Sequence, residues 1–145
     1  MLLGQILKTV GKEYQGIYIH GISFDSRKVK KQYIFFAVEG NQTSGAKYIN
    51  DAILNGASVI IASNKINYKN RKVPIIIVKD VRKCLSEACS NLYKDKPTNI
   101  IAVTGTNGKS SVVNFFYQIL NLNKIPVASI GTLGIFSKKY NKKIN

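Results

Sequence analysis

The sequence has few residues of the kinds that bind transition metals. It contains two cysteines, Cys84 and Cys89, and one histidine, His20, in 145 residues. The cysteines are not spaced as CxxC, and these three residues cannot form a zinc site without carboxylates. Cys89 belongs to an apolar series with the spacing of one helix face. We therefore expect Cys89 to be a core thiol of a protein in a reducing compartment.

Acidic residues are also scarce, with 7 against 22 basic residues and a formal net charge of +15. Only three of the basic residues are arginines, whereas proteins that read nucleic-acid sequence favour arginine for base edges. We interpret the charge as a lysine-rich surface exposed to solvent. Steering of an anionic ligand and binding to nucleic acid remain as alternative interpretations.

Long apolar runs are absent, so the sequence predicts no membrane-spanning helix. Residues 1–8 lack the charged start, the long apolar run and the cleavage site of a signal peptide. We expect them to form the first amphipathic helix of a cytoplasmic protein that does not bind membranes. The length of the chain suggests one domain, or one domain and part of another.

Strand patterns and helix patterns alternate along the first two thirds of the chain. Apolar runs typical of strands cover residues 17–24, 33–38, 58–62 and 74–78. Helical patterns cover residues 1–8, 45–55 and 80–94, with Gly56 as a C-cap and Asp80 as an N-cap. The alternation predicts an α/β domain with a mainly parallel sheet. Residues 63–73 are predicted to be a polar loop.

A charged, proline-containing stretch around residues 94–98 predicts a domain boundary. We expect one domain over residues 1–97 and the start of a second over 98–145. The second part has a strand pattern over 99–103, a helix over 109–123 and a strand over 126–130, which together form one βαβ unit. Residues 131–134 turn out of it, and residues 137–145 show no periodicity.

The most informative stretch is Thr-Gly-Thr-Asn-Gly-Lys-Ser-Ser at residues 104–111, between a predicted strand and a predicted helix. Gly105 and Gly108 allow a tight turn whose N–H groups face phosphate oxygens. Lys109 would reach the terminal phosphates, and Ser110 would offer a hydroxyl to Mg²⁺. The sequence predicts a nucleotide phosphate site here, against the alternative of a polar strand–helix turn with a chance Gly-Lys-Ser.

The loop is shorter than the general P-loop pattern, because Val103 stands where that pattern has its first glycine. In this form it resembles the ATP loop of the Mur ligase superfamily, whose members use ATP to activate a carboxylate as an acyl phosphate that an amine then attacks. The resemblance implies Lys109 as a catalytic residue and Ser110 as a ligand of Mg²⁺. It also implies a set of ATP-binding residues: Gly105, Thr106, Asn107, Gly108, Lys109, Ser110 and Ser111.

The first domain resembles the uridine-nucleotide domain of two Mur ligases. The resemblance rests on residues 21–29, which contain Asp-Ser-Arg, on 33–40, and on Gly-Ala-Ser-Val-Ile-Ile at 56–61. One of these ligases adds the third residue, and the other the D-Ala-D-Ala dipeptide, to the peptidoglycan stem peptide. The resemblance implies these residues at the UDP end of the substrate: Phe24, Ser26, Asn41, Gln42 and Thr43. Asp25-Ser26-Arg27 alone could be a local turn held by an Asx hydrogen bond.

The loop sequence and residues 131–134 are most like the branch that adds the third residue. The fold class expected is therefore α/β: a Mur-ligase substrate domain followed by the first βαβ unit of a P-loop central domain. The resemblance implies ATP-dependent joining of diaminopimelate or lysine to UDP-N-acetylmuramoyl-L-Ala-D-Glu by a monomer. The alternatives are the dipeptide-adding ligase and a non-catalytic nucleotide- or nucleic-acid-binding module.

The sequence has no Asp or Glu after Asp95. A complete P-loop enzyme needs a carboxylate near the loop to help hold Mg²⁺, and one βαβ unit cannot cover both faces of its sheet. We therefore expect the chain to be the N-terminal piece of a longer enzyme and to be inactive alone.

Overall fold

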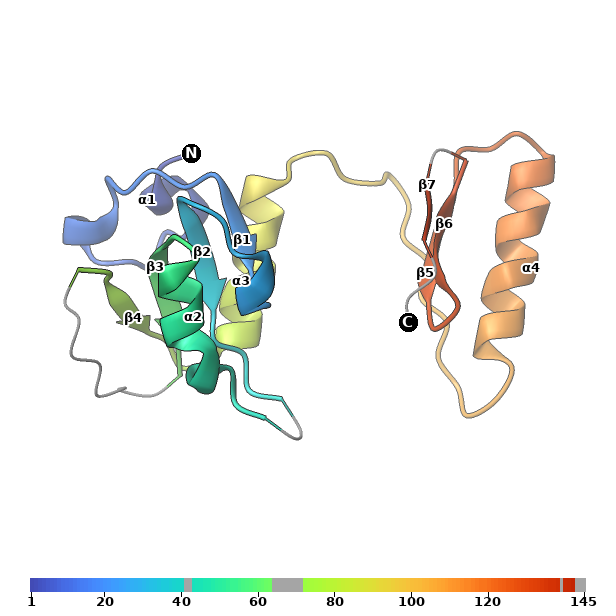
Figure 1. Ribbon diagram of the computed structural model, residues 1–145. Coiled ribbons are helices and arrows are strands. Elements are labelled where there is room, and N and C mark those ends of the chain that lie inside the picture. Colours follow the sequence, from blue (N-terminus) through green and yellow to red (C-terminus); the bar gives the residue numbers. More distant parts are fainter. Residues whose placement is uncertain (41–42, 64–71, 139, 143–145) are drawn as a thin grey trace. The chain divides into compact units, whose positions relative to one another are not determined.

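The computed structural model describes residues 1–40, 43–63, 72–138 and 140–142. Asn41 and Gln42, and most of the predicted loop over 63–73, lie outside the described residues. The chain divides into two compact units, Met1–Lys96 and Pro97–Asn145 (Figure 1). In the described part of the chain, no helix is long and apolar enough to cross a membrane.

The first unit is built on a four-stranded parallel sheet with the strand order β1-β2-β3-β4 (Figure 1). Its strands are β1 (Gly21–Ser23), β2 (Tyr33–Phe36), β3 (Ala57–Ala62) and β4 (Ile75–Ile77). The two central strands, β2 and β3, are almost continuously apolar and buried, as expected when a parallel sheet is covered on both faces. The predicted α/β fold class and parallel sheet are confirmed.

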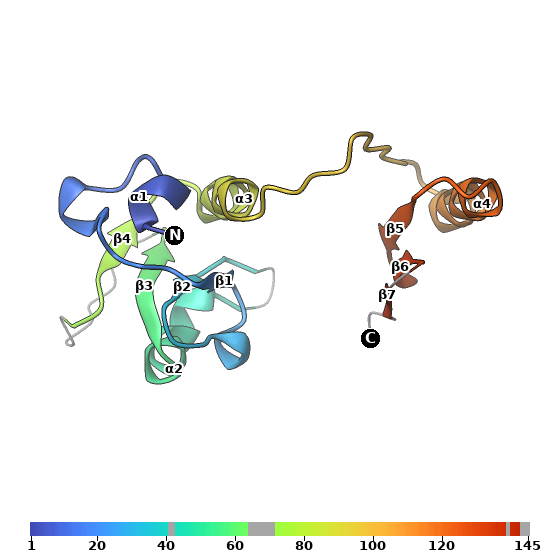
Figure 2. The ribbon, with the colours of Figure 1, turned by 90° about the horizontal axis from the view of Figure 1, so that it is seen from above.

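Helices cover both faces of this sheet. Figure 2 shows α1 (Leu3–Ile6) and α3 (Val81–Leu92) on one side and α2 (Ile49–Leu54) on the other. Successive residues of a strand point to opposite faces, so Ile34 and Phe36 pack with α1 and α3, whereas Phe35 packs with α2. The sequence of β2 therefore supplies two cores, one on each side of the sheet.

The turns of the first unit contain short 3₁₀ helices: η1 (Lys12–Tyr14), η2 (Ser26–Lys28) and η3 (Gly45–Tyr48). The helix predicted over 45–55 is η3 followed directly by α2. Gly56 ends it with φ +104°, and a Cβ at this position would lie 2.9 Å from the Cα of Lys31. Asp80 caps α3 as predicted, because its Oδ1 accepts a hydrogen bond from the backbone N–H of Lys83 at 2.9 Å.

The helix α3 turns a different thiol inward from the one predicted. Its buried residues are Val81, Cys84 and Ala88, which follow one another at spacings of three and four along the inner face. Cys84 is 7% exposed, whereas Cys89 is half-buried. The prediction of Cys89 as the core thiol is wrong, because Cys89 lies one residue beyond this face.

The second unit contains α4 (Lys109–Leu122) and an antiparallel sheet of β5 (Ala128–Gly131), β6 (Gly134–Ser137) and β7 (Tyr140–Lys142). The helix agrees with the prediction to one residue. Residues 137–145 show no periodicity in the sequence, yet β6 ends at Ser137 and β7 lies among them. Sheet pairing forms there although the sequence has no apolar alternation, because backbone groups make the ladder.

The strand predicted over residues 99–103 does not form. Ile100 is 81% exposed, and the segment pairs with no strand. A strand needs a neighbour for its N–H and C=O groups, and β5 pairs with β6 instead. The apolar face of α4 is also exposed, since none of the residues of the helix is buried. Its exposed large apolar residues are Val112, Phe115, Phe116, Ile119 and Leu122.

Candidate functional site

A cavity of about 540 Å³ opens in the first unit where the chain leaves β1 and β2. Because the strands are parallel, the segments that follow them meet at one edge of the sheet. Phe24 follows β1 and Thr43 belongs to the turn after β2, and the first turns of α3 complete the wall. The lining residues are Phe24, Val38, Gly40, Thr43, Gly45, Tyr48, Arg82, Leu85 and Ser86.

The predicted uridine-site residues lie differently with respect to this cavity. Phe24 and Thr43 line it, and the Phe24 ring is 68% exposed, so a ligand could pack on it. Ser26 is 7% exposed and is not one of the lining residues. Asn41 and Gln42 lie outside the described residues. The structure therefore brings two of the five predicted residues together around the cavity.

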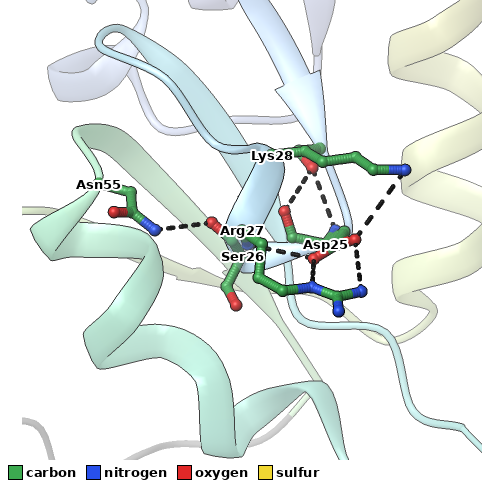
Figure 3. Close-up of polar contacts among 6 residues, drawn as sticks. Asp25, Ser26, Arg27, Lys28 and Asn55 are labelled. Carbon is green, nitrogen blue, oxygen red and sulfur yellow. Dashed lines mark hydrogen bonds and ion pairs between the residues drawn. The ribbon is translucent and has the colours of Figure 1, made fainter.

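The Asp-Ser-Arg segment forms a hydrogen-bonded turn after β1 (Figure 3). Asp25 Oδ1 accepts a hydrogen bond from the backbone N–H of Arg27 at 3.1 Å, which is the Asx turn considered from the sequence. The hydroxyl of Ser23 donates to the carbonyl oxygen of Asp25 at 2.8 Å. Asn55 Nδ2 donates to the carbonyl oxygen of Ser26 at 3.0 Å, which ties the turn to the end of α2.

Arg27 also forms a two-pronged ion pair with Asp25. Its Nε lies 3.0 Å from Oδ1 and its Nη2 lies 3.0 Å from Oδ2. The side-chain hydrogen bond from Arg27 is the main cause that holds the pKa of Asp25 below its usual range, and the same bond raises the pKa of Arg27. The pair helps to hold the turn that follows Phe24, a lining residue of the cavity.

The glycine loop at residues 104–111 has the backbone that a phosphate site requires. Gly105 has φ +145° and Gly108 has φ +76°, conformations that L side chains rarely adopt. Gly108 is also the N-cap of α4, so the loop runs directly into the positive end of a 14-residue helix. First-turn N–H groups have no partner within their own helix and can face an anion.

The side chains of the loop are arranged around this backbone. Lys109 Nζ donates to the carbonyl oxygens of Gly105, at 2.5 Å, and Thr106, at 2.9 Å, so the ammonium group curls back over the loop. Ser110 Oγ lies 3.1 Å from Thr132 Oγ1, in the turn between β5 and β6. Lys109, Ser110 and Thr132 line a smaller cavity of about 190 Å³.

Two contributors to the sites were not recognised in the sequence. Arg82 lines the first cavity from α3, far along the chain from the turns after β1 and β2. The feature of the sequence that could have drawn attention to Arg82 is the rarity of arginine, with three arginines among 22 basic residues. Thr132 was recognised only as part of residues 131–134, as a turn and as part of the resemblance, and nothing local in the sequence links its hydroxyl to Ser110.

Known proteins resemble the chain over most of its length. A UDP-N-acetylmuramoyl-L-alanyl-D-glutamate–2,6-diaminopimelate ligase of Rickettsia prowazekii is 48% identical over 117 residues, which are 81% of this chain and 24% of that protein. The ligase of the same name from Mesorhizobium japonicum is 35% identical over 97% of this chain and 29% of that protein. The chain therefore spans about a quarter of the length of these curated relatives.

Solved structures and a family profile agree with this likeness. The structure of a UDP-N-acetylmuramoyl-L-alanyl-D-glutamate–2,6-diaminopimelate ligase superposes with a TM-score of 0.76 and 26% identity, covering 97% of this chain and 29% of that chain. A profile described as Mur ligase family, catalytic domain, matches residues 18–93. That range contains the first cavity, including Phe24, Thr43 and Arg82, and is more than half of the chain. The chain belongs to the Mur ligase family.

Proposed function

We propose that the chain is the N-terminal part of a cytoplasmic ATP-dependent ligase that joins 2,6-diaminopimelate to UDP-N-acetylmuramoyl-L-Ala-D-Glu in peptidoglycan synthesis. The observation that carries the proposal is that relatives bearing this name align with 81–97% of the chain at 35–48% identity. Two free cysteines in the chain are in keeping with a reducing compartment.

In this proposal the first unit binds the UDP end of the substrate. An aromatic ring and hydroxyl groups around a concave, mostly apolar wall suit a nucleobase and its ribose. Phe24 supplies the ring and Thr43 supplies a hydroxyl at the cavity. Asn41 and Gln42 immediately precede Thr43 in the sequence, and Ser26 belongs to the hydrogen-bonded turn after β1. These residues remain proposed as UDP contacts.

The glycine loop binds ATP in this proposal, through Gly105, Thr106, Asn107, Gly108, Lys109, Ser110 and Ser111. Lys109 moves from the loop carbonyls to the terminal phosphates, where its charge stabilises the phosphoryl group that is transferred. Its two present hydrogen bonds are to neutral carbonyl oxygens, and a phosphate oxygen is a stronger, charged acceptor.

Mg²⁺ would be held at the loop by the hydroxyl of Ser110 together with the phosphates of the nucleotide. Oxygen ligands suit this ion, and Ser110 and Thr132 both present hydroxyls at the smaller cavity. The sequence after Asp95 has no carboxylate, so the donors of this part are incomplete for the ion. Bound Mg²⁺ would neutralise phosphate charge during phosphoryl transfer.

The test measures binding of UDP-N-acetylmuramoyl-L-Ala-D-Glu to residues 1–145 by calorimetry, with a random-sequence single-stranded DNA as the comparison ligand. The proposal predicts saturable binding of one UDP ligand per chain that UDP displaces. Tight binding of the DNA that falls steeply with salt, with no heat from the UDP ligand, would instead favour the nucleic-acid module suggested by the +15 charge.

Substitution of Ser26 examines one residue within that site. Ser26→Ala should lower the affinity for the UDP ligand if the hydroxyl contacts it. Asn55→Ala should lower that affinity only indirectly, by removing the hydrogen bond to the carbonyl oxygen of Ser26 that holds the turn. Unchanged affinity in Ser26→Ala, with the wild type binding normally, removes Ser26 from the site and leaves the function of the unit intact.

A further inference from the structure

Among the described residues, the wall of the first cavity contains a single charged side chain, Arg82. The remaining lining residues are aromatic, aliphatic, hydroxyl-bearing or glycine. Both ion pairs of the described residues centre on Asp25, with Arg27 and Lys28, so neither neutralises Arg82. Arg82 also lies in the first turn of α3, where the partial positive charge of the helix end adds to its own. The cavity therefore has an apolar wall and one positive position.

The Arg82 side chain is exposed, and its guanidinium makes a hydrogen bond to the turn after β2. Its Nη2 donates to the carbonyl oxygen of Glu39 at 2.9 Å, across 43 residues of sequence. Glu39 stands at the base of the turn after β2, where the Glu39 carboxylate accepts a hydrogen bond from the hydroxyl of Ser44 at 2.9 Å. The N–H of Gly40 donates to the carbonyl oxygen of Thr43 at 2.9 Å and closes the turn.

This anchoring uses one of the five N–H donors of the guanidinium. The other donors remain in a fixed plane, which is the geometry that favours two-point contact with phosphate oxygens. A lysine at the same position would supply a point charge without that plane. Arg82 therefore combines a positional contact to the turn with donors for an anion.

We propose that Arg82 binds the diphosphate of the UDP-linked ligand, and so determines that the cavity accepts a nucleoside diphosphate rather than a nucleoside. This proposal rests on the proposed function of the first unit. Phe24 would pack on the base while Arg82 contacts the negative charge, and the two lining residues come from different elements, the segment after β1 and the first turn of α3. Arg82 touches the ligand in this account and does not act only through the turn.

The experiment compares the affinity of residues 1–145 for UDP and for uridine by calorimetry. The variants are Arg82→Gln and Arg82→Lys, and the matched control is Lys83→Gln, which removes the same charge from the next residue of α3, outside the cavity lining. We expect Arg82→Gln to weaken UDP about 10- to 100-fold, as for loss of a charged hydrogen bond, and to change uridine affinity by less than about 2-fold. Arg82→Lys should give an intermediate loss, and Lys83→Gln should bind as the wild type does.

A purely structural role for Arg82 predicts a different pattern, because a loosened turn would lower the affinities for UDP and for uridine alike. Equal loss of UDP and uridine affinity in Arg82→Gln would overturn the proposal, and so would unchanged UDP affinity. Arg82→Lys keeps a donor for the Glu39 carbonyl, so it reports on the ligand even if Arg82→Gln unfolds. Wild-type protein that binds neither UDP nor uridine would overturn the proposed function as well. Wild-type protein that binds UDP with an affinity unchanged by substitution of Arg82 would overturn this inference alone.

Discussion

Arg27 closes a fork on Asp25, with Nε 3.0 Å from Oδ1 and Nη2 3.0 Å from Oδ2 (Figure 3). The two residues are separated by one residue, Ser26, so the contact tightens a single turn of chain. The carboxylate of Asp25 additionally accepts the backbone N–H of Arg27 at 3.1 Å. One ionised side chain thus holds the shape of the turn that follows Phe24, and the protonation of Asp25 affects the stability of the fold.

Removal of the Asp25 carboxylate should make the free energy of unfolding depend less on pH. Because the Arg27 hydrogen bond lowers the pKa of Asp25 in the folded state, the pair stabilises the fold above 3.8, the ordinary pKa of the group, and this stabilisation is lost as the pH falls through the lower folded-state value. Asp25→Asn should be less stable than the wild type at pH 7, with the gap closing in strong acid. Denaturant unfolding between neutral pH and pH 2 measures this, and a gap that stays constant with pH would contradict it.

The two thiols should differ in reactivity. Burial is the main cause that raises the pKa of Cys84 to about 11, and burial also raises that of Cys89. Because the thiolate is the reactive form and Cys84 is the less exposed thiol, maleimide at pH 8 should label Cys89 first and label Cys84 mainly after unfolding. Mass spectrometry of Cys84→Ser and Cys89→Ser proteins resolves the two rates. Faster labelling of the protein that retains only Cys84 would mean that α3 turns a different face inward.

The parallel sheet should depend on the apolar residues of β3. Ile61 is fully buried in the core shared with α1 and α3, so Ile61→Ala should lower the free energy of unfolding by about 2–5 kcal/mol. Leu54→Ala is the matched control, because Leu54 lies at the end of α2 and is 85% exposed. Denaturant unfolding of residues 1–145 compares the two, and similar small losses at both sites would be inconsistent with the two-faced sheet.

The sequence predicted the first unit well because its information is local. Val59, Ile60 and Ile61 form an apolar run bounded by turn residues, and Asp80 and Gly56 mark helix ends by mechanisms that act within a few residues. Cys89 was misassigned because one helical step, about 100°, separates an inward position from a flanking one. Phe24 was predicted from the resemblance to contact the UDP ligand; it lines the cavity, and the contact itself stays a prediction.

The second unit and the cavity wall were harder to predict because they depend on distant pairing. Residues 99–103 have the composition of a strand, but a strand forms only where a neighbour supplies hydrogen bonds. The polar residues 140–142 form β7, by contrast, because β6 lies beside them and supplies those hydrogen bonds. Arg82 reaches the turn after β2 through a contact across 43 residues, and no pattern within α3 itself indicates that contact.

Substitution of Lys109 should lower the rate of ATP turnover in a protein that carries the complete ligase. In a longer protein made by joining residues 1–145 to the remaining three quarters of the Rickettsia prowazekii ligase, Lys109→Ala should lower the rate of ADP release by at least about 100-fold, since it removes charge stabilisation of the transferred phosphoryl group. Lys124→Ala, which removes a lysine just beyond α4 and outside the smaller cavity, is the control. Equal rates in the two variants would remove Lys109 from catalysis.

Ligation by the same joined protein tests the central claim most directly. The measurement is formation of UDP-N-acetylmuramoyl tripeptide from UDP-N-acetylmuramoyl-L-Ala-D-Glu, ATP and diaminopimelate, with residues 1–145 alone assayed in parallel. The account predicts tripeptide that depends on all three substrates from the joined protein and none from residues 1–145, because much of the rate comes from holding the three reactants together. A folded joined protein that binds ATP and the UDP dipeptide yet forms no tripeptide, or Lys109-dependent ligation by residues 1–145 alone, would contradict it.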